Sequence, residues 1–286
     1  MDKKGLAVIT GADGGMGSEI TRAVAQAGYP IVMACRDMEK AENVRQQIIA
    51  ETGNTRIECL HLDLASLDIV AGVADFLLRR AEPIALLMNN AGTMETARRT
   101  TADGLERTVS VNYVGPYLLT RKLLPLMSSG SRIVNMVSCT YAIGKLEFPD
   151  FFTMGRKGGF WRIPIYSNTK LALTLFSLKL AEICRTSGIM VNAADPGIVS
   201  TDIITMHQWF DPLTDIFFRP FIRTPRQGAD TAIRLLLDAA WAETTGCLFA
   251  SGRPKTLSPH YLHHPQSNEL WERTEQIVAR WLMKTE

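Results

Sequence analysis

The chain has 286 residues, 46% of them hydrophobic, and a formal net charge of +2 at pH 7. This length allows one α/β domain or two small ones, and the nearly balanced charge, with its basic pairs scattered, excludes a nucleic-acid-binding surface. No uninterrupted apolar run of about 18 residues is present, so we expect no membrane span.

Two further features narrow the class of protein. The first apolar run begins at Leu6, which leaves no room for a signal peptide before it. The cysteines are odd in number and lack metal-ligand spacing: Cys35, Cys59, Cys139, Cys184 and Cys247. We therefore expect a cytoplasmic globular protein with reduced, buried thiols and no metal site.

The first part of the chain is predicted to form a strand, a glycine-rich turn, a helix and a second strand. Leu6–Ile9 and Ile31–Cys35 are short apolar runs typical of buried parallel strands. The turn contains Gly11, Gly14, Gly15 and Gly17, and Gly28 ends the helix. Residues without a Cβ let backbone N–H groups approach an anion at a helix N-terminus. A loop with unusual backbone angles would also use glycines, but the place between strand and helix favours a dinucleotide site.

The rest of the chain alternates between helical and strand patterns. We expect helices over residues 38–51, 67–79, 102–127 (with a kink at Pro116) and 165–185, and strands over residues 57–62, 84–88, 132–137 and 189–194. Gly53 and Gly188 are expected to end two of these helices. The alternation predicts a single-domain α/β fold, a doubly wound, Rossmann-type parallel sheet with helices on both faces. The domain is expected over residues 1–252, and its C-terminal extension, 253–286, contains a helix over about residues 268–283.

Arg36 points to the cofactor, because ligands bind beyond the carboxyl ends of the strands in such a sheet. It follows the second strand, where an NAD-binding domain has an acidic residue for the ribose hydroxyls. A guanidinium there suits a 2′-phosphate, whereas the alternative is a solvated surface arginine. Asp13 lies in the glycine-rich turn near the expected 2′-phosphate, and its negative charge would repel that phosphate. NADP(H) is the expected cofactor and NAD(H) the alternative.

Small or polar residues follow the next two strands: Asp63, Leu64, Asn89, Asn90, Ala91 and Gly92. Any turn uses such residues, so only their place at the ligand edge makes them candidates. Asn112 lies inside a predicted helix, where its amide competes for backbone groups. The alternative for Asn112 is a solvent-facing side chain.

Ser138, Tyr166 and Lys170 form the constellation with the clearest chemistry. Ser138 follows a predicted strand, and Tyr166 and Lys170 are four residues apart on a predicted helix, so they share a face. A phenol is a poor base at neutral pH, but a nearby ammonium lowers its pKa and suits it to proton transfer. A lone Tyr-x-x-x-Lys pair is commonly surface packing. Its position after these strands favours a catalytic site in which Ser138 binds the reacting oxygen.

Over residues 5–250 the chain resembles the classical short-chain dehydrogenases/reductases. The resemblance is carried by motifs in the family's order and spacing: Thr10–Gly17, Asp63, Asn89–Gly92, Asn112, Ser138, Tyr166–Lys170 and Asp195–Thr201. It implies a sheet of seven parallel strands, a homodimer or homotetramer, and a small-molecule alcohol or carbonyl substrate.

The resemblance also implies roles for individual residues. Tyr166 is the acid/base, Lys170 binds the nicotinamide ribose and lowers the tyrosine pKa, Ser138 orients the substrate oxygen, and Asn112 supports a water-mediated proton path. The implied cofactor-binding residues are Gly11, Asp13, Gly15, Met16, Gly17, Arg36, Asp63, Leu64, Asn90, Ala91, Gly92, Tyr166, Lys170, Pro196, Gly197, Val199 and Thr201.

Two departures bear on cofactor and substrate. Gly14 replaces the polar or basic residue that many NADP-dependent members have in the turn, which leaves Arg36 as the main phosphate-binding residue. Ser138 and Tyr166 are farther apart than in most classical members, and the extra segment is aromatic: Phe148, Phe151, Phe152, Phe160 and Trp161. With Arg36, this looks most like the branch of retinol dehydrogenases and protochlorophyllide reductases, which act on lipophilic molecules with NADP(H).

Residues 202–224 are rich in large apolar side chains and are expected to form a flap over the substrate. Packing on the core or on a partner subunit is the alternative. A flap that meets the aromatic segment predicts a lipophilic pocket. The expected function is NADP(H)-dependent interconversion of a retinol-like, steroid-like or other bulky alcohol and its carbonyl. A catalytically silent nucleotide-binding regulatory or scaffolding protein on the same fold is the alternative.

Overall fold

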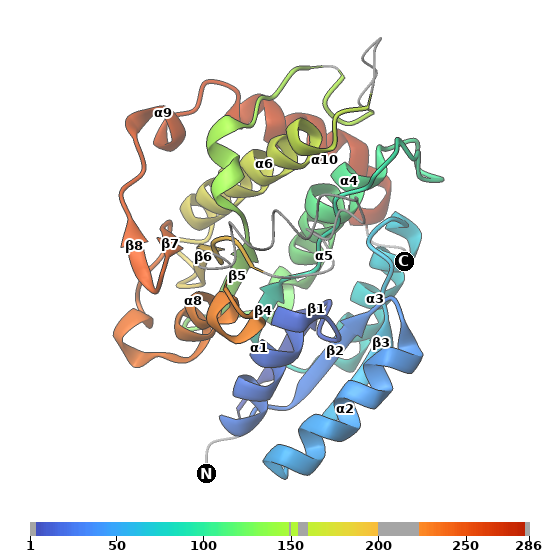
Figure 1. Ribbon diagram of the computed structural model, residues 1–286, viewed down its shortest axis with the longest axis vertical. Helices are drawn as coiled ribbons and strands as arrows, with labels where there is room; N and C mark the ends of the chain where they lie inside the picture. The colour runs from blue at the N-terminus through green and yellow to red at the C-terminus, as the bar shows by residue number, and fades with distance from the viewer. Residues whose placement is uncertain (1–3, 149, 154–159, 200–222, 284–286) are drawn as a thin grey trace, which may run out of the picture.

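One sheet runs through the molecule. The computed structural model describes residues 4–148, 150–153, 160–199 and 223–283. In this part of the chain the strands are ordered β3-β2-β1-β4-β5-β6-β7-β8 (Figure 1). They are β1 (Leu6–Thr10), β2 (Ile31–Cys35), β3 (Ile57–His61), β4 (Ile84–Asn89), β5 (Arg132–Met136), β6 (Met190–Asp195), β7 (Leu248–Ala250) and β8 (Arg253–Lys255).

Seven strands are parallel, as the resemblance implied, and the eighth is antiparallel. β8 pairs with β7 so that Pro254 lies opposite Phe249. It falls in the C-terminal extension, where only a helix was expected, and adds one antiparallel strand to the seven expected parallel strands. The sequence Arg-Pro-Lys lacks the apolar alternation by which a strand is recognised.

Helices cover both faces of the sheet, as predicted. One face packs against α1 (Gly15–Gln26), α2 (Met38–Thr52) and α8 (Pro225–Leu237), and the other against α3 (Leu67–Arg80), α5 (Gly115–Leu123) and α6 (Arg162–Ile183). Alternate residues of β1 serve the two cores, Val8 in one and Ile9 in the other. Outside this second layer, α10 (Ser267–Leu282) packs against α3, α5 and α6 (Figure 1).

Of the glycines predicted to end helices, Gly28 and Gly53 do so, whereas α6 already ends at Ile183 and Gly188 lies in the turn that follows. Gly28, Gly53 and Gly188 have φ angles of +77°, +70° and +68°. Only glycine adopts this left-handed conformation without strain from a Cβ. The chain therefore leaves α1 and α2 in the direction that brings it back to the sheet.

The helix expected over residues 102–127 is shorter and irregular. It begins only at α4 (Arg107–Val109), because the Glu106 carboxylate accepts a hydrogen bond from Val109 N at 3.0 Å and caps it. A π-helical turn, η1 (Ser110–Val114), follows, and the 3₁₀ turn η2 (Leu124–Leu126) comes after α5. Pro116 has no N–H for the Asn112 carbonyl, so the predicted kink takes the form of this π turn.

Three short elements complete the description: η3 (Cys139–Ile143), η5 (Ala239–Trp241) and α9 (Pro259–Leu262). All five cysteines are free, but only Cys35 and Cys184 are buried, while Cys59 and Cys247 are partly buried and Cys139 is exposed. This corrects the expectation that every thiol is buried. Among the described helices, none has the length and apolar character needed to cross a membrane. The same residues contain no cluster of His, Cys, Asp and Glu that could hold a metal ion.

Candidate active site

The glycine-rich turn between β1 and α1 is too tight for larger residues. Gly11 has a φ of +59°, and a Cβ built on Gly17 would lie 2.0 Å from the Gly11 carbonyl oxygen. Gly14 precedes α1 and has no side chain to cap it, so the first amides of the helix face outward without a capping group. Free N–H groups at the positive end of a helix dipole bind anions.

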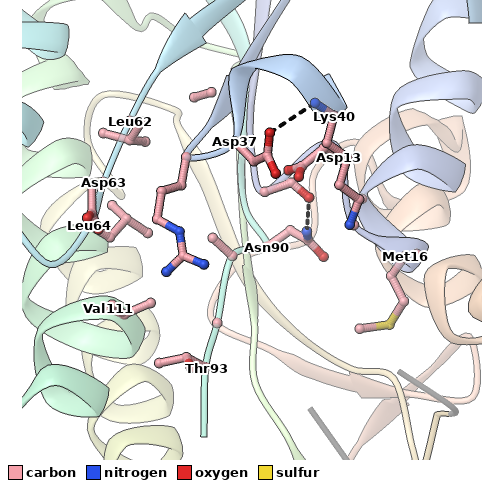
Figure 2. A pocket seen from close by; sticks show the side chains of 18 of the residues that line it. Asp13, Met16, Asp37, Lys40, Leu62, Asp63, Leu64, Asn90, Thr93 and Val111 are labelled. Atoms are coloured by element: carbon pink, nitrogen blue, oxygen red, sulfur yellow. Dashed lines mark hydrogen bonds between the residues drawn. The ribbon is translucent and has the colours of Figure 1, made fainter. Parts of the chain in front are cut away.

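This turn opens onto a pocket of about 520 Å³ beyond the carboxyl ends of the strands. Eleven of the predicted cofactor residues line it: Gly11, Asp13, Gly15, Met16, Gly17, Arg36, Asp63, Leu64, Asn90, Ala91 and Gly92. In Figure 2, Asp13, Lys40 and Met16 lie along one side of the pocket, while Leu62, Asp63, Leu64 and Val111 lie along the other. The parallel strands bring these distant residues together because their carboxyl ends share one edge.

Thr10 and Asn90 fasten the turn to the end of β4. Thr10 Oγ1 accepts hydrogen bonds from the backbone N–H of Asn90 at 3.0 Å and of Ala91 at 3.1 Å. Asn90 Nδ2 donates to the carbonyl oxygens of Thr10 and Gly11, both at 3.1 Å. Within the described residues, the buried Asn90 Oδ1 has no hydrogen-bond partner. A buried acceptor left open in a pocket wall suits a ligand that donates a hydrogen bond.

Two cations, Arg36 and Lys40, line the pocket beside the end of β2. Lys40 was not predicted from the sequence, although its place in the first turn of α2, four residues after Arg36, was a usable signal. Asp37 also lines the pocket, but its carboxylate caps α2 by accepting from Lys40 N at 3.0 Å. Asp13 hydrogen-bonds the Cys35 thiol, and burial together with this charge raises the pKa of that thiol. The thiol is a neutral partner, so it does not offset the charge of Asp13 that is predicted to oppose a phosphate.

These residues fit a dinucleotide. The uncapped amides of α1 match a pyrophosphate, and the open acceptor of Asn90 matches a ribose or base donor. Arg36 and Lys40 match an additional phosphate, since cations form strong hydrogen bonds to phosphate oxygens. All of these groups line the same pocket, as an extended ligand requires.

Ser138, Tyr166 and Lys170 meet beyond the end of β5. The Tyr166 hydroxyl is hydrogen-bonded to the Ser138 side chain, and Lys170 Nζ lies 5.4 Å from the centre of the Tyr166 ring. Lys170 Nζ also donates a hydrogen bond to the Met136 carbonyl oxygen at 2.8 Å. The strand and one face of α6 therefore bring the three predicted catalytic side chains together.

Burial controls the protonation of this group. It raises the pKa of Tyr166 to about 12, although the hydrogen bond with Ser138 acts in the opposite direction. It also lowers the pKa of Lys170 to about 8, against the charge of Asp195. In the protein alone the pKa of Tyr166 is thus raised overall, and its lowering by Lys170 stays a prediction. At neutral pH Tyr166 is a neutral phenol, which is the proton-donating form.

Asn112 lies in the π turn and forms the predicted catalytic tetrad with Ser138, Tyr166 and Lys170. It connects this tetrad to the end of β4. Its Oδ1 accepts from Thr93 N at 2.7 Å, and its Nδ2 donates to the Thr93 carbonyl at 2.8 Å and to Thr169 Oγ1 at 3.1 Å. A Cβ built on Gly92 would lie 3.4 Å from Asn112 Oδ1 and 3.7 Å from Lys170 Nζ. Gly92 therefore leaves open the space that borders both predicted catalytic side chains and the pocket.

The segment after β6 turns sharply beside the tetrad. Gly197 has a φ of +75°, and its N–H donates to Asp195 Oδ1 at 3.0 Å. The Pro196 carbonyl accepts from Arg223 Nη1 at 3.2 Å. Asp195 acts electrostatically on Tyr166 and Lys170, so this turn starts next to the catalytic group.

Val199 comes close to Met16, another predicted cofactor residue. A Cβ built on Gly228 of α8 would lie 2.6 Å from Val199 and 3.0 Å from Met16 Sδ. Pro196, Gly197 and Val199 do not line the pocket described above. Thr201 and residues 202–222 of the expected flap lie outside the described residues.

The aromatic residues expected to line a substrate pocket differ in how far they are exposed to solvent. Phe151 and Phe152 are 2% and 6% exposed and belong to the hydrophobic core, and the Phe151 ring lies 5.9 Å from that of Tyr113. Trp161, by contrast, is 71% exposed. The expectation is therefore wrong for Phe151 and Phe152, which pack beneath the π turn.

Comparison with known proteins identifies the family. Residues 5–151 match the model of the short chain dehydrogenases. Retinol dehydrogenase 12 of Homo sapiens is 32% identical over 280 residues, covering 96% of this chain and 87% of that protein. The chain belongs to the short-chain dehydrogenase family. Within it, the similarity lies with the retinol dehydrogenase branch, as the resemblance in the sequence implied.

Solved structures share the fold. A putative uncharacterized protein from Mycobacterium paratuberculosis has a TM-score of 0.76 and 26% identity, covering 96% of this chain and 94% of its own. L-sorbose reductase from Gluconobacter frateurii, complexed with NADPH and L-sorbose, has a TM-score of 0.70 and 22% identity over 89% of this chain and 98% of its own. As a short-chain dehydrogenase, the chain is an oxidoreductase that interconverts alcohols and carbonyl compounds.

Proposed function

We propose that this short-chain dehydrogenase uses NADP(H) to interconvert a lipophilic alcohol and its aldehyde or ketone. The observation that carries the cofactor choice is the pair of cations Arg36 and Lys40 in the pocket wall beside β2. A guanidinium and an ammonium there favour a ribose with a 2′-phosphate over one with free hydroxyls. Asp37, the acid between them in sequence, is occupied as the cap of α2.

The chain's own residues supply positioning and proton transfer. The bound nicotinamide supplies or accepts the hydride. Tyr166 is a phenol at neutral pH and donates its proton to the substrate oxygen in the reductive direction. Ser138 binds the same oxygen, since its side chain already lies at the Tyr166 hydroxyl. Lys170 and Asn112 border the space beside Gly92 and hold the proton path to Tyr166.

Two observations support a lipophilic substrate. The relative described above is named for retinol, a long apolar alcohol. Exposed apolar side chains also lie in the segments that flank the tetrad, Trp161 before α6 and Ile198 after β6. Apolar groups at the mouth of a site stabilise an apolar ligand through the surface that both remove from water.

A series of straight-chain aldehydes, assayed by NADPH oxidation, tests both parts of the proposal. Each buried methylene contributes about 0.8 kcal/mol, or roughly fourfold, so kcat/KM should rise steeply with chain length. The Tyr166→Phe variant, purified in parallel, is the control for contaminating reductases. A kcat/KM that does not change with chain length would refute the lipophilic substrate and leave the NADP(H)-dependent reaction untouched. Tight NADPH binding without turnover of any carbonyl compound would refute the enzyme and favour a nucleotide-binding regulatory protein.

A further inference from the structure

The π turn η1 places two neighbouring residues in different surroundings. Asn112 is hydrogen-bonded to Thr93 and Thr169 at the candidate active site. Tyr113, the next residue, is 1% exposed and lies against the C-terminal helix α10. One turn of backbone therefore joins the proposed proton path to the last helix of the chain.

Tyr113 makes a hydrogen bond whose direction the structure determines. Its hydroxyl lies 2.8 Å from Thr274 Oγ1 of α10. The Thr274 hydroxyl donates its own hydrogen to the Leu270 carbonyl at 2.6 Å, so it accepts from Tyr113. Both side chains are buried, and the Tyr113 ring lies 5.9 Å from Phe151 and 6.4 Å from Phe176. Losing Thr274 would leave the buried Tyr113 hydroxyl unpaired, whereas losing Tyr113 would leave Thr274 bonded to Leu270 alone.

A π turn depends on such contacts because it is less favourable than continuous α-helix. Here Ser110 Oγ donates to the Leu64 carbonyl at 3.0 Å at one end of the turn, and Asn112 is bonded to its active-site partners. The Tyr113–Thr274 hydrogen bond holds the side of the π turn that faces α10. A π turn contains one residue more than a turn of α-helix, and a helix rotates by about 100° per residue. If the π turn relaxed to α-helix, Asn112 would therefore rotate away from Thr93 and Thr169.

We propose that α10 is part of the catalytic apparatus, and that Tyr113 and Thr274 are positioning residues that hold Asn112 through the π turn. The inference rests on the proposed function in so far as Asn112 acts in proton transfer. It assigns to the C-terminal helix a role in the reaction besides covering the core.

The other bonds between α5 and α10 provide a matched control. Tyr117, one turn after Tyr113, donates to the Glu275 carboxylate, which Arg121 also contacts. Trp271 packs on Tyr117 with ring centres 5.2 Å apart. These contacts tie the same two helices together but lie beyond the π turn. Tyr117→Phe should therefore destabilise the packing of α5 on α10 while Asn112 keeps its position.

The test uses Thr274→Val, Tyr113→Phe and the double variant in the full chain. We expect kcat to fall about tenfold in each, the usual value of one hydrogen bond, with the NADPH dissociation constant unchanged. The double variant should be no slower than either single variant, because both changes remove the same bond. Thr274→Ser retains the hydroxyl and should restore the rate.

Backbone amide exchange over residues 110–117 measures the π turn without any turnover. We expect faster exchange in Thr274→Val and Tyr113→Phe than in Tyr117→Phe at equal loss of melting temperature. Equal exchange and equal kcat in all three would overturn the proposal, as would additive losses in the double variant. Faster exchange in a protein that reduces no carbonyl compound would retain the positioning of the turn and refute the proposed function instead.

Discussion

Lys170 Nζ lies 5.4 Å from the centre of the Tyr166 ring and donates to the Met136 carbonyl from a position that is almost fully buried. The ammonium is thus held beside the phenol by α6 and β5, with little water to solvate its charge. Burial lowers the pKa of Lys170 to about 8. The site therefore contains a cation whose charge destabilises the folded protein at neutral pH.

Replacing Lys170 by Met should change how stability depends on pH. The lysine pKa is lowered from 10.5 to about 8 on folding, so between these values the unfolded wild-type chain holds a proton that the folded chain has lost. Wild-type stability should gain about 3 kcal/mol across this window, and Lys170→Met should lack the gain. Urea unfolding at pH 7.5 and pH 10 measures the difference. The exposed Lys145→Met is the control, and parallel pH curves for Lys170→Met and wild type would contradict the assignment.

Tyr166→Phe should lower kcat by at least about 100-fold, the low end for general acid–base catalysis, because the proton donor is lost. NADPH affinity, measured by fluorescence titration, should stay within about twofold, since the change removes only a hydroxyl bonded to Ser138. Tyr141→Phe, a buried tyrosine of η3, should remain active. Near-normal turnover in Tyr166→Phe would end the proposed mechanism.

Arg36→Ala and Lys40→Ala should each weaken NADPH binding without weakening NADH binding. A charge-assisted hydrogen bond contributes about 1.5–3 kcal/mol, which is roughly 10- to 150-fold in affinity. Titration of both cofactors by fluorescence measures the effect. Arg79→Ala removes the same charge from an exposed site outside the pocket and should change neither affinity. Equal affinity of the wild-type protein for the two cofactors would refute the NADP(H) preference.

Asp13→Asn should increase the preference for NADPH. The carboxylate lines the pocket that contains Arg36 and Lys40, and at close range a like charge costs about 1 kcal/mol in water, or roughly fivefold in affinity. Asparagine can still accept a hydrogen bond from the Cys35 thiol, so the fold of the turn should survive. The ratio of the two dissociation constants is the measurement. An unchanged ratio would mean that Asp13 is directed away from the phosphate.

Much of the fold could be predicted because its signals are local. Gly28 and Gly53 end helices through a backbone angle that the residue type itself favours. The apolar runs of β1 and β2 are buried on both sides, as parallel strands are. Once the sheet is parallel, side chains that follow its strands must gather at one edge. This is why Arg36 and Asn90 were found from sequence.

The remainder depends on contacts between distant residues. The π turn contacts Thr274, far away in the chain, through the Tyr113 hydroxyl, and no local signal indicates that contact. Phe151 and Phe152 have the composition of a pocket wall, and only the packing of Tyr113 on Phe151 shows that they belong to the core. In the sequence, Lys40 resembles any exposed lysine of an amphipathic helix. It lines the pocket because of the direction in which α2 leaves β2.

The antiparallel strand β8 has a consequence for self-association. An exposed edge strand offers a row of free N–H and C=O groups with which another molecule can continue the sheet. Here that edge is three residues long and carries Arg253 and Lys255 on either side of Pro254, which has no N–H to donate. All three side chains are exposed, and the two like charges would oppose a second copy aligned alongside. The β8 edge thus resists fibrous, strand-by-strand growth of the sheet from one molecule into the next.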